Sequence, residues 1–472
     1  MRTHVDLPVS LSRESGAPLT AQLAGWLRRA MLDGTLAPGE RLPSTRSLAA
    51  QLAVSRTVVT EAYQQLYAEG WLDGRHGSGT FVADMEVTRP PREETPYVPA
   101  PPPAPAEWID LTPGRPWVRD YDRAAWKRAW RRAADLPPGD DPTPYGLPRL
   151  RELLADHLRR ARGVAVGPEN ILVTRGTGNG LDLCALALLG AGTRAGVEDP
   201  GYHAARTIFE ARGAEVVACP VDEDGVVVDG LPGDLRVLYT TPAHQYPLGG
   251  RLPIPRRERL LAWARSTGAT IVEDDYDAEF RYDVAPLPAL YGLDPSRVVL
   301  LGTLSKTLAP DVGVGWLVGA PELVVTIAGL RRSVGDRTSG PVQQAVVNLL
   351  EHGDLDRHLR RMRLEYARRR AAVVELLGPV CRLRGDTAGL HVVAELPAPV
   401  AADVVERARR RGVLLDSIDR HHHGRARVHG LVIGYGSASL ADVRRGCRIL
   451  ADLICAGPGV RRVTSGAQNG IE

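Results

Sequence analysis

The chain has 472 residues, 44% hydrophobic and 24% charged, which is enough for two or three soluble domains with a sizeable core. Its net charge of +3 excludes a polybasic nucleic-acid binder, so any contact with DNA must depend on the placement of a few side chains. The five cysteines have neither metal-ligand nor disulfide spacing, and we find no signal peptide or apolar run of membrane length. We expect a cytoplasmic protein with no bound metal.

Residues 10–83 predict a small helical domain. Apolar residues recur at helical spacing over residues 18–33, after which Ser44 can cap a second helix and Ser55 a third. Two helices joined by a tight turn are typical of a helix-turn-helix, in which the second helix enters the major groove of DNA. Two short strands around a Gly-rich turn at residues 74–82 would add a wing.

A proline-rich stretch at residues 84–107 separates this domain from the remainder of the chain. Proline runs favour an extended polyproline conformation, so this stretch is predicted to be a linker. Residues 108–455 then form the large domain. The Gly-rich, polar tail at residues 456–472 is expected to be mobile.

In the large domain, short β-rich runs alternate with helical stretches. This alternation favours an α/β fold with a mostly parallel, doubly wound sheet. The predicted strands are residues 170–174, 194–198, 215–218, 236–239, 270–273, 298–301 and 315–318. One long Arg-rich helix is predicted near residues 345–375, and a smaller α/β lobe from residue 401.

Lysine is almost absent from this chain. Lysine and arginine together number 59, but only Lys127 and Lys306 are lysines. Lys306 follows the predicted strand at residues 298–301. Arginine cannot lose its proton near neutral pH, whereas a desolvated lysine can become a neutral amine and form an imine with an aldehyde. Lys306 therefore predicts a site for pyridoxal 5′-phosphate.

Other polar groups follow the ends of predicted strands, where such a cofactor binds in an α/β sheet. Asp274 could pair with the ring nitrogen and keep it protonated, and Tyr276 could donate to the phenolic oxygen of the ring. Tyr202 could stack on the ring. The turn at residues 241–249 could line its edge.

A phosphate-binding end is also predicted. Gly176 and Thr177 precede a predicted helix, and free backbone N–H groups at a helix start bind phosphate well. The hydroxyl of Thr303, three residues before Lys306, could contact the same phosphate.

The first domain resembles the winged helix-turn-helix of GntR-type regulators. The similarity lies in residues 41–49, 54–59 and 76–82. By this resemblance, Arg56 is the best candidate for a bidentate contact with guanine. The residues that it implies at phosphates, bases or the minor groove are Arg46, Ser55, Arg56, Thr57, Thr60, His76 and Gly77.

Residues 198–202, 244–247 and 273–282, together with the segment around Lys306, resemble the MocR/GabR subfamily over residues 18–455. This resemblance implies a GntR-type domain fused to a fold-type I aminotransferase-like domain that holds pyridoxal phosphate. It also implies a homodimer that binds double-stranded DNA with paired half-sites. The effector would be pyridoxal phosphate or a small amine that displaces Lys306 from the cofactor.

Two positions depart from the subfamily. The arginine that usually stands seven residues after the imine lysine is replaced by Gly313, and Arg175 might take over its contact with the cofactor phosphate. The arginine that receives a substrate carboxylate in these folds is not evident, although Arg425 or Arg427 could serve. The effector is therefore not expected to be an ordinary amino acid.

Two alternatives remain open. An active aminotransferase would need the missing carboxylate clamp, and a DNA-binding dimer that has lost its cofactor would be consistent with Gly313. The three consecutive histidines at residues 421–423 suggest metal binding at first sight. They cannot all face one ion from a regular element, so a solvated loop is predicted there.

Overall fold

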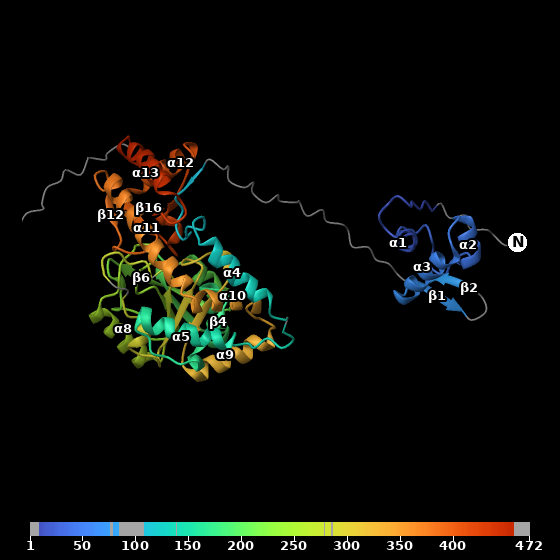
Figure 1. The fold of residues 1–472 in the computed structure, drawn as a ribbon, viewed down its shortest axis with the longest axis horizontal. Helices are drawn as coiled ribbons and strands as arrows, with labels where there is room; N and C mark the ends of the chain where they lie inside the picture. The colour runs from blue at the N-terminus through green and yellow to red at the C-terminus, as the bar shows by residue number, and fades with distance from the viewer. Residues whose placement is uncertain are drawn as a thin grey trace, which may run out of the picture. The chain divides into compact units, whose positions relative to one another are not determined.

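The computed structural model describes residues 9–75, 79–84, 108–137, 139–277, 279–284 and 287–456. The chain forms two compact units, residues 1–102 and 103–472 (Figure 1). The predicted linker and tail lie outside the described residues except for Asp84 and Ala456, and the domain boundaries stay predictions.

The first unit is a three-helix domain with a two-stranded wing. Its elements are α1 (Leu19–Leu32), α2 (Thr45–Gln51), α3 (Arg56–Ala68), β1 (Leu72–Arg75) and β2 (Gly79–Val82). The Ser44 hydroxyl accepts from the N–H of Ser47, and the Ser55 hydroxyl from that of Val58, so both predicted helix caps are confirmed. β1 and β2 pair antiparallel. Leucines of all three helices fill the core between them.

The second unit contains a central sheet of eight strands in the order β4-β11-β10-β9-β8-β5-β6-β7. The strands are β4 (Ile171–Thr174), β5 (Arg194–Asp199), β6 (Glu215–Asp222), β7 (Gly225–Val226), β8 (Leu235–Thr240), β9 (Thr270–Asp275), β10 (Val298–Thr303) and β11 (Gly315–Val318). Strands β10, β9, β8, β5 and β6 are parallel, whereas β11 and β7 are antiparallel to their neighbours. All seven predicted strands are present.

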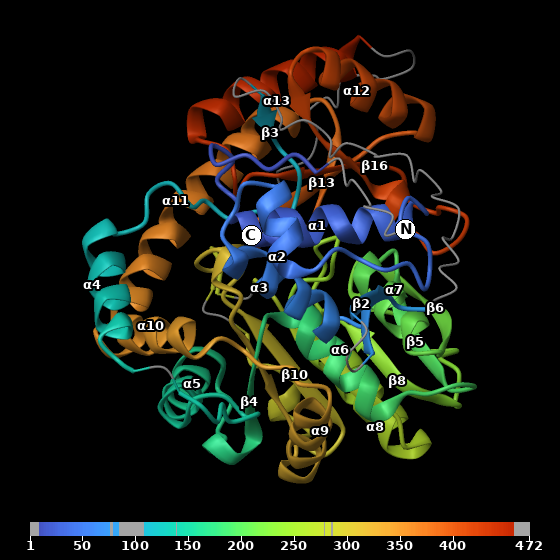
Figure 2. The same ribbon diagram turned by 90° about the vertical axis from the view of Figure 1, so that its right-hand side faces the viewer.

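Helices cover this sheet because its inner strands are apolar on both faces; every residue of β10 and β11 is buried. The helices of this large lobe are α4 (Arg123–Ala134), α5 (Pro148–Arg162), α6 (Thr177–Leu188), α7 (His203–Ala211), α8 (Ile254–Thr267), α9 (Pro321–Ser333) and α10 (Gly340–Glu351). Figure 2 shows α6, α8 and α9 against the strands. The α/β fold with a doubly wound lobe is confirmed.

A small lobe completes the second unit and contains an antiparallel sheet in the order β12-β13-β16-β15. Its elements are α11 (Asp354–Leu377), β12 (Arg382–Arg384), β13 (His391–Glu395), α12 (Ala398–Arg410), β14 (Val413–Leu414), β15 (Asp416–Ser417), β16 (Gly430–Gly434) and α13 (Leu440–Cys455). β14 pairs with β3 (Ile109–Asp110), the first described strand of this unit. Figure 1 shows the small lobe in orange and red above the large sheet.

The single helix predicted near residues 345–375 is wrong, because two helices occupy this stretch. α10 ends at Glu351, and α11 begins at Asp354 after Gly353, whose φ of 63° lies in the left-handed region. A glycine in this conformation ends the regular hydrogen-bond pattern, and the helical periodicity of the flanking residues hid the break. Among the described helices, none combines the length and hydrophobicity needed to cross a membrane.

Candidate functional site

A cavity of about 400 Å³ lies at the carboxyl ends of the parallel strands, where pockets form in α/β sheets. All eight residues predicted to contact the cofactor line it: Arg175, Gly176, Thr177, Tyr202, Asp274, Tyr276, Thr303 and Lys306. The structure therefore brings together segments that are up to 131 residues apart in the sequence (Arg175 to Lys306). The role of each residue stays a prediction.

Lys306 lies directly after β10 with its side chain largely buried. Burial lowers the pKa of its amine, although the nearby carboxylates of Asp274 and Asp277 oppose this shift. The amine donates a hydrogen bond to the backbone carbonyl of Gly114. A lowered pKa makes the neutral, nucleophilic amine available closer to neutral pH than in an ordinary lysine.

Asp274 lies near the end of β9 and is 4% exposed. Its Oδ2 accepts a hydrogen bond of 2.7 Å from the Tyr239 hydroxyl, whereas its Oδ1 has no partner among the described residues. Burial raises the pKa of this carboxyl to about 7, the Tyr239 bond counteracts part of the shift, and Asp275 adds to it. An unpartnered, buried carboxylate oxygen in a cavity suits a cationic N–H donor of a ligand.

The acids beside Asp274 have different partners. Asp275 forms a buried bidentate ion pair with Arg162, with N–O distances of 2.6 and 2.9 Å. Glu273 accepts from the backbone N–H groups of Leu290 and Tyr291. Because side chains alternate along a strand, only the middle acid of this run turns toward the cavity. Asp275 and Glu273 are therefore fully engaged with protein groups, whereas Asp274 has an oxygen available to a ligand.

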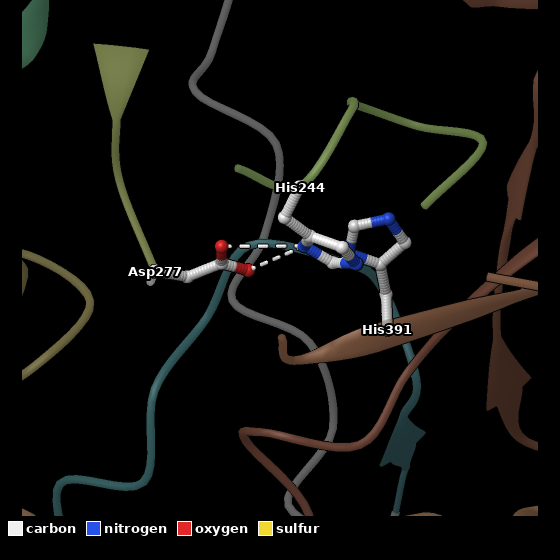
Figure 3. A group of neighbouring side chains, drawn as sticks. All are labelled: His244, Asp277 and His391. Carbon is white, nitrogen blue, oxygen red and sulfur yellow. Dashed lines mark hydrogen bonds and ion pairs between the residues drawn. The ribbon is translucent and has the colours of Figure 1, made fainter. Parts of the chain in front are cut away.

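Tyr276 joins the cavity to a buried cluster at the junction of the two lobes (Figure 3). Its hydroxyl donates to the carbonyl of His244 at 3.1 Å and lies 3.0 Å from the Nδ1 of that ring. Asp277 accepts from the same Nδ1 at 3.0 Å. Donation from Tyr276 to a cofactor oxygen would require this hydroxyl to leave the His244 carbonyl.

His391, on β13 of the small lobe, completes the cluster. One ligand-type atom each of His244, Asp277 and His391 lies within 4.8 Å of the other two (Figure 3). His391 Nε2 lies 2.9 Å from the carbonyl oxygen of Pro247, and burial lowers the pKa of this ring to about 3. We interpret the cluster as a hydrogen-bonded lobe contact; the absence of a metal stays a prediction.

The opposite end of the cavity offers hydrogen-bond donors for an anion. Gly176, with a φ of 115°, precedes α6, whose first N–H groups have no acceptor within the helix. A Cβ added to Gly176 would lie 3.4 Å from the Thr303 hydroxyl and 3.6 Å from that of Ser305. These two hydroxyls are 3.0 Å apart. Backbone and hydroxyl donors therefore surround one point, as a phosphate requires.

Arg175 is the one arginine that lines this cavity. Its guanidinium pairs with Asp336, which is also held by the buried Arg331 at 2.8 Å. The side chain of Arg175 is 53% exposed, so it could turn toward a phosphate in the cavity. Gly313 lies at the end of a short 3₁₀ turn, and a Cβ added to it would meet open space.

Aromatic side chains line part of the cavity. Tyr202, which follows β5, is 37% exposed, and its ring centroid lies 6.3 Å from that of Tyr239 and 6.2 Å from that of Tyr246. This position is consistent with stacking on a flat ligand ring.

Two predictions about the small lobe are corrected. The histidines at residues 421–423 were predicted to be a solvated loop, but the side chains of His421 and His422 are only 7% and 1% exposed. His421 pairs with Asp416 at 3.2 Å, and Asp199 accepts from the backbone N–H of His423 at 2.8 Å. These carboxylates satisfy groups that water would otherwise have to solvate.

The candidate carboxylate arginines are also not at the cavity. Arg427 lines a separate surface cleft with Arg382 and Arg384, and Arg425 is not among the residues that line the cavity. The cations that line the cavity among the described residues are Lys306 and Arg175.

The sequence analysis missed several lining residues, and three of them contact predicted site residues. Ser305 stands beside Lys306 and could have been inferred from the same strand end. Tyr239 ends a predicted strand, but its bond to Asp274 depends on the order of strands in the sheet. Gly114 precedes Lys306 by 192 residues, and no local signal places it at the cavity.

Several residues predicted to contact DNA lie at the start of α3, and their roles stay predictions. Arg56 and Thr57 are exposed, and Arg56 donates a hydrogen bond of 3.3 Å to Thr45 on α2. The Ser55 hydroxyl caps α3, and the Thr60 hydroxyl donates to the Arg56 carbonyl, so both already have backbone partners. The exposed Arg46 lies on α2. His76 and Gly77 fall outside the described residues.

Comparison with known proteins identifies both units. Residues 19–82 match the family described as "Bacterial regulatory proteins, gntR family", and residues 121–423 match "Aminotransferase class I and II". Over 459 residues the chain is 39% identical to the HTH-type pyridoxine biosynthesis transcriptional regulator PdxR of Corynebacterium glutamicum, covering 96% of this chain and 99% of that protein. It is 32% identical to the probable rhizopine catabolism regulatory protein MocR of Rhizobium meliloti, covering 94% and 96%. The chain belongs to the MocR/GabR subfamily of GntR-type transcription regulators.

Solved structures resemble the second unit of this MocR/GabR-type regulator. An archaeal alanine:glyoxylate aminotransferase matches with a TM-score of 0.68 and 25% identity over 74% of this chain and 91% of that one. The kynurenine aminotransferase of Pyrococcus horikoshii, solved in complex with PMP, matches with a TM-score of 0.68 and 26% identity over 74% and 91%. The protein is thus a transcription regulator with an aminotransferase-like domain, and the predicted family is confirmed.

Proposed function

We propose that this regulator binds pyridoxal 5′-phosphate covalently through Lys306 and binds DNA in a manner that depends on the occupancy of the cavity. The observation that carries the proposal is that one cavity holds both the buried amine of Lys306 and a buried carboxylate oxygen, Asp274 Oδ1, that has no partner among the described residues. A ligand that offers both an aldehyde and a cationic ring N–H satisfies both groups.

The residues of the cavity fit the separate parts of this cofactor. Asp274 would accept from the ring nitrogen, with Tyr239 holding the carboxylate in place. Tyr202 would cover one face of the ring. When bound, the cofactor supplies an electrophilic carbon with which Lys306 can form a reversible covalent bond.

The phosphate would bind at the start of α6. Gly176 allows the close approach, and the hydroxyls of Thr303 and Ser305 add donors to the N–H of Thr177. Arg175 would contribute the charge that Gly313 cannot supply, by exchanging its contact with Asp336 for the phosphate.

We propose pyridoxal phosphate itself, rather than an amino acid, as the effector. An amino-acid carboxylate needs a cation in addition to those that hold the cofactor, and Lys306 and Arg175 are the cations lining the described cavity. The relative from Corynebacterium glutamicum, named as a regulator of pyridoxine biosynthesis, supports the same reading. A small amine without a carboxylate remains compatible with this cavity.

We further propose a homodimer whose two α3 helices read paired half-sites in double-stranded DNA. Dimeric helix-turn-helix proteins bind half-sites whose spacing reflects the symmetry of the protein. Arg56 would read guanine in each half-site, while Arg46 and Thr57 would contact the DNA backbone.

The test is the affinity of the protein for DNA with and without pyridoxal phosphate at fixed salt. DNA fragments would first be selected from a random library by the cofactor-free protein. Saturating cofactor should change their Kd by roughly 5- to 150-fold, the usual range of allosteric coupling, with no change in a Lys306→Ala variant. An equal Kd in the presence of demonstrably bound cofactor would contradict the proposal.

A further inference from the structure

The segment that follows linker residues 85–107 leads directly to the cofactor cavity. Its strand β3 pairs with β14, and the backbone N–H of Leu111 donates to Leu414 at 3.0 Å. The carbonyl of Leu111 accepts from Gly434 on β16 at 2.8 Å. These contacts attach the start of the second unit to the small lobe.

The same segment then forms one wall of the cavity, with Pro113 and Gly114 among the lining residues. The Lys306 amine donates to the carbonyl of Gly114, and over the described residues this is its one hydrogen bond. Gly114 has a φ of 78°, and a Cβ there would lie 3.4 Å from Lys306 Nζ. Glycine therefore allows the backbone to adopt this turn and to approach the amine closely.

Capture of an aldehyde removes the hydrogens that make this bond. The neutral amine of Lys306 has two N–H hydrogens, and both leave with the aldehyde oxygen as one water when the carbon–nitrogen double bond forms. The nitrogen then carries at most the one proton that it can gain from solvent. Without that proton, the nitrogen has no hydrogen to donate to the Gly114 carbonyl.

We propose that the Lys306–Gly114 hydrogen bond is a latch that covalent capture of the cofactor releases, so that residues 111–115 carry the occupancy signal from the cavity to the linker. The inference rests on the proposed function, because it takes pyridoxal phosphate as the ligand. The latch joins Lys306 of the large lobe to a segment attached to the small lobe. Its release frees the segment that follows the linker and removes one contact between the lobes.

Hydrogen–deuterium exchange on the full-length protein tests the latch. The N–H groups of Leu111 and Thr112 are bonded to Leu414 and Asp110, so their exchange reports opening of this segment. In the cofactor-free state, a Lys306→Met variant should exchange in peptides covering residues 108–117 roughly tenfold faster than the parent, as expected for loss of a hydrogen bond to a charged group. Lys127→Met, which removes the other lysine from the exposed face of α4, should exchange like the parent.

Two ligands distinguish covalent capture of the aldehyde by Lys306 from non-covalent binding in the cavity. Pyridoxal phosphate should accelerate exchange of these peptides in the parent to the rate of Lys306→Met and leave that variant unchanged. Pyridoxine 5′-phosphate, which carries an alcohol in place of the aldehyde, should not accelerate exchange in the parent. Equal exchange of the two cofactor-free proteins would overturn the latch, as would unchanged exchange in a parent with the cofactor bound. If the parent fails to bind the cofactor, the proposed function fails and release by capture fails with it, whereas the comparison of the cofactor-free proteins still decides whether the Lys306–Gly114 bond holds this segment.

Discussion

An Asp274→Asn variant is expected to lose most of its affinity for pyridoxal phosphate and yet to be more stable than the parent without the cofactor. The cofactor loses the negative partner of its ring nitrogen, and removal of one member of a buried ion pair costs about 3–5 kcal/mol, or at least ~100-fold in affinity. Fluorescence or absorbance titration with the cofactor measures this loss.

The gain in stability follows from the pKa of Asp274, which burial raises to about 7 from an ordinary 3.8. A carboxyl whose pKa is raised on folding destabilises the native state as pH rises from about 4 to 7, and the full cost applies above 7. Three units correspond to about 4 kcal/mol. The buried N–H of the new asparagine has no acceptor, which destabilises the variant by about 1–3 kcal/mol. The free energy of unfolding at pH 8 should therefore rise by about 1–3 kcal/mol in total.

Urea unfolding of the cofactor-free protein at pH 8 and pH 5 measures this difference. The gain should be largest at pH 8 and should shrink at pH 5, where Asp274 is protonated in the parent. Asp275→Asn is the contrasting control, because it leaves the buried Arg162 without its partner and should destabilise at both values. A variant at Asp274 that is less stable than the parent at pH 8, or that keeps parental affinity for the cofactor, would contradict this assignment.

An Arg56→Ala variant is expected to lose roughly 1–3 kcal/mol of specific DNA affinity, about 5- to 150-fold, because a bidentate contact with guanine discriminates by this amount. Affinity for non-specific DNA should fall much less, so the ratio of specific to non-specific binding should fall as well. Fluorescence anisotropy at one salt concentration measures both values.

Arg29→Ala provides the control for this change in the same unit. Arg29 is exposed on the last turn of α1, away from the start of α3, and its loss should change specific affinity by less than about twofold. If Arg56→Ala bound the selected DNA as well as Arg29→Ala does, α3 would not read the sequence in the proposed way. The far-UV circular dichroism of both variants should match that of the parent, because the hydrogen bond from the Arg56 side chain to Thr45 is exposed.

Local signals were sufficient to predict the first unit. The hydroxyls of Ser44 and Ser55 cap α2 and α3 at the predicted positions, and β1 and β2 pair antiparallel as a wing requires. Caps and turns depend on neighbours in the sequence, so they can be read without knowledge of the tertiary fold. The strands of the large sheet were predicted for a similar reason, since each is a short apolar run.

The sequence predicted the site residues that follow the ends of strands. It did not predict residues whose place at the site depends on the order of strands or on the packing of the lobes. Asp274 and Lys306 follow predicted strands, and parallel strands bring such residues to one edge. Tyr239 reaches Asp274 because β8 and β9 are neighbours, and Gly114 reaches Lys306 because the small lobe holds its segment there. Both contacts are properties of the tertiary arrangement.

The polar appearance of residues 421–423 led to the wrong prediction of a solvated loop. The burial of these histidines depends on two carboxylates, Asp416 and Asp199. Asp199 lies more than 200 residues earlier in the chain. Polar residues are buried when partners are available, and a sequence does not reveal partners at that distance. The break between α10 and α11 was missed because one glycine in a long helical pattern is usually tolerated.

The visible absorption spectrum after addition of pyridoxal phosphate tests the central claim most directly. The purified full-length protein and a Lys306→Ala variant would be incubated with the cofactor and then freed of excess by gel filtration. The account predicts an absorption band retained by the parent and absent from the variant. A parent without the band, or a variant that retains it, would contradict the assignment of Lys306 as the residue that holds the cofactor.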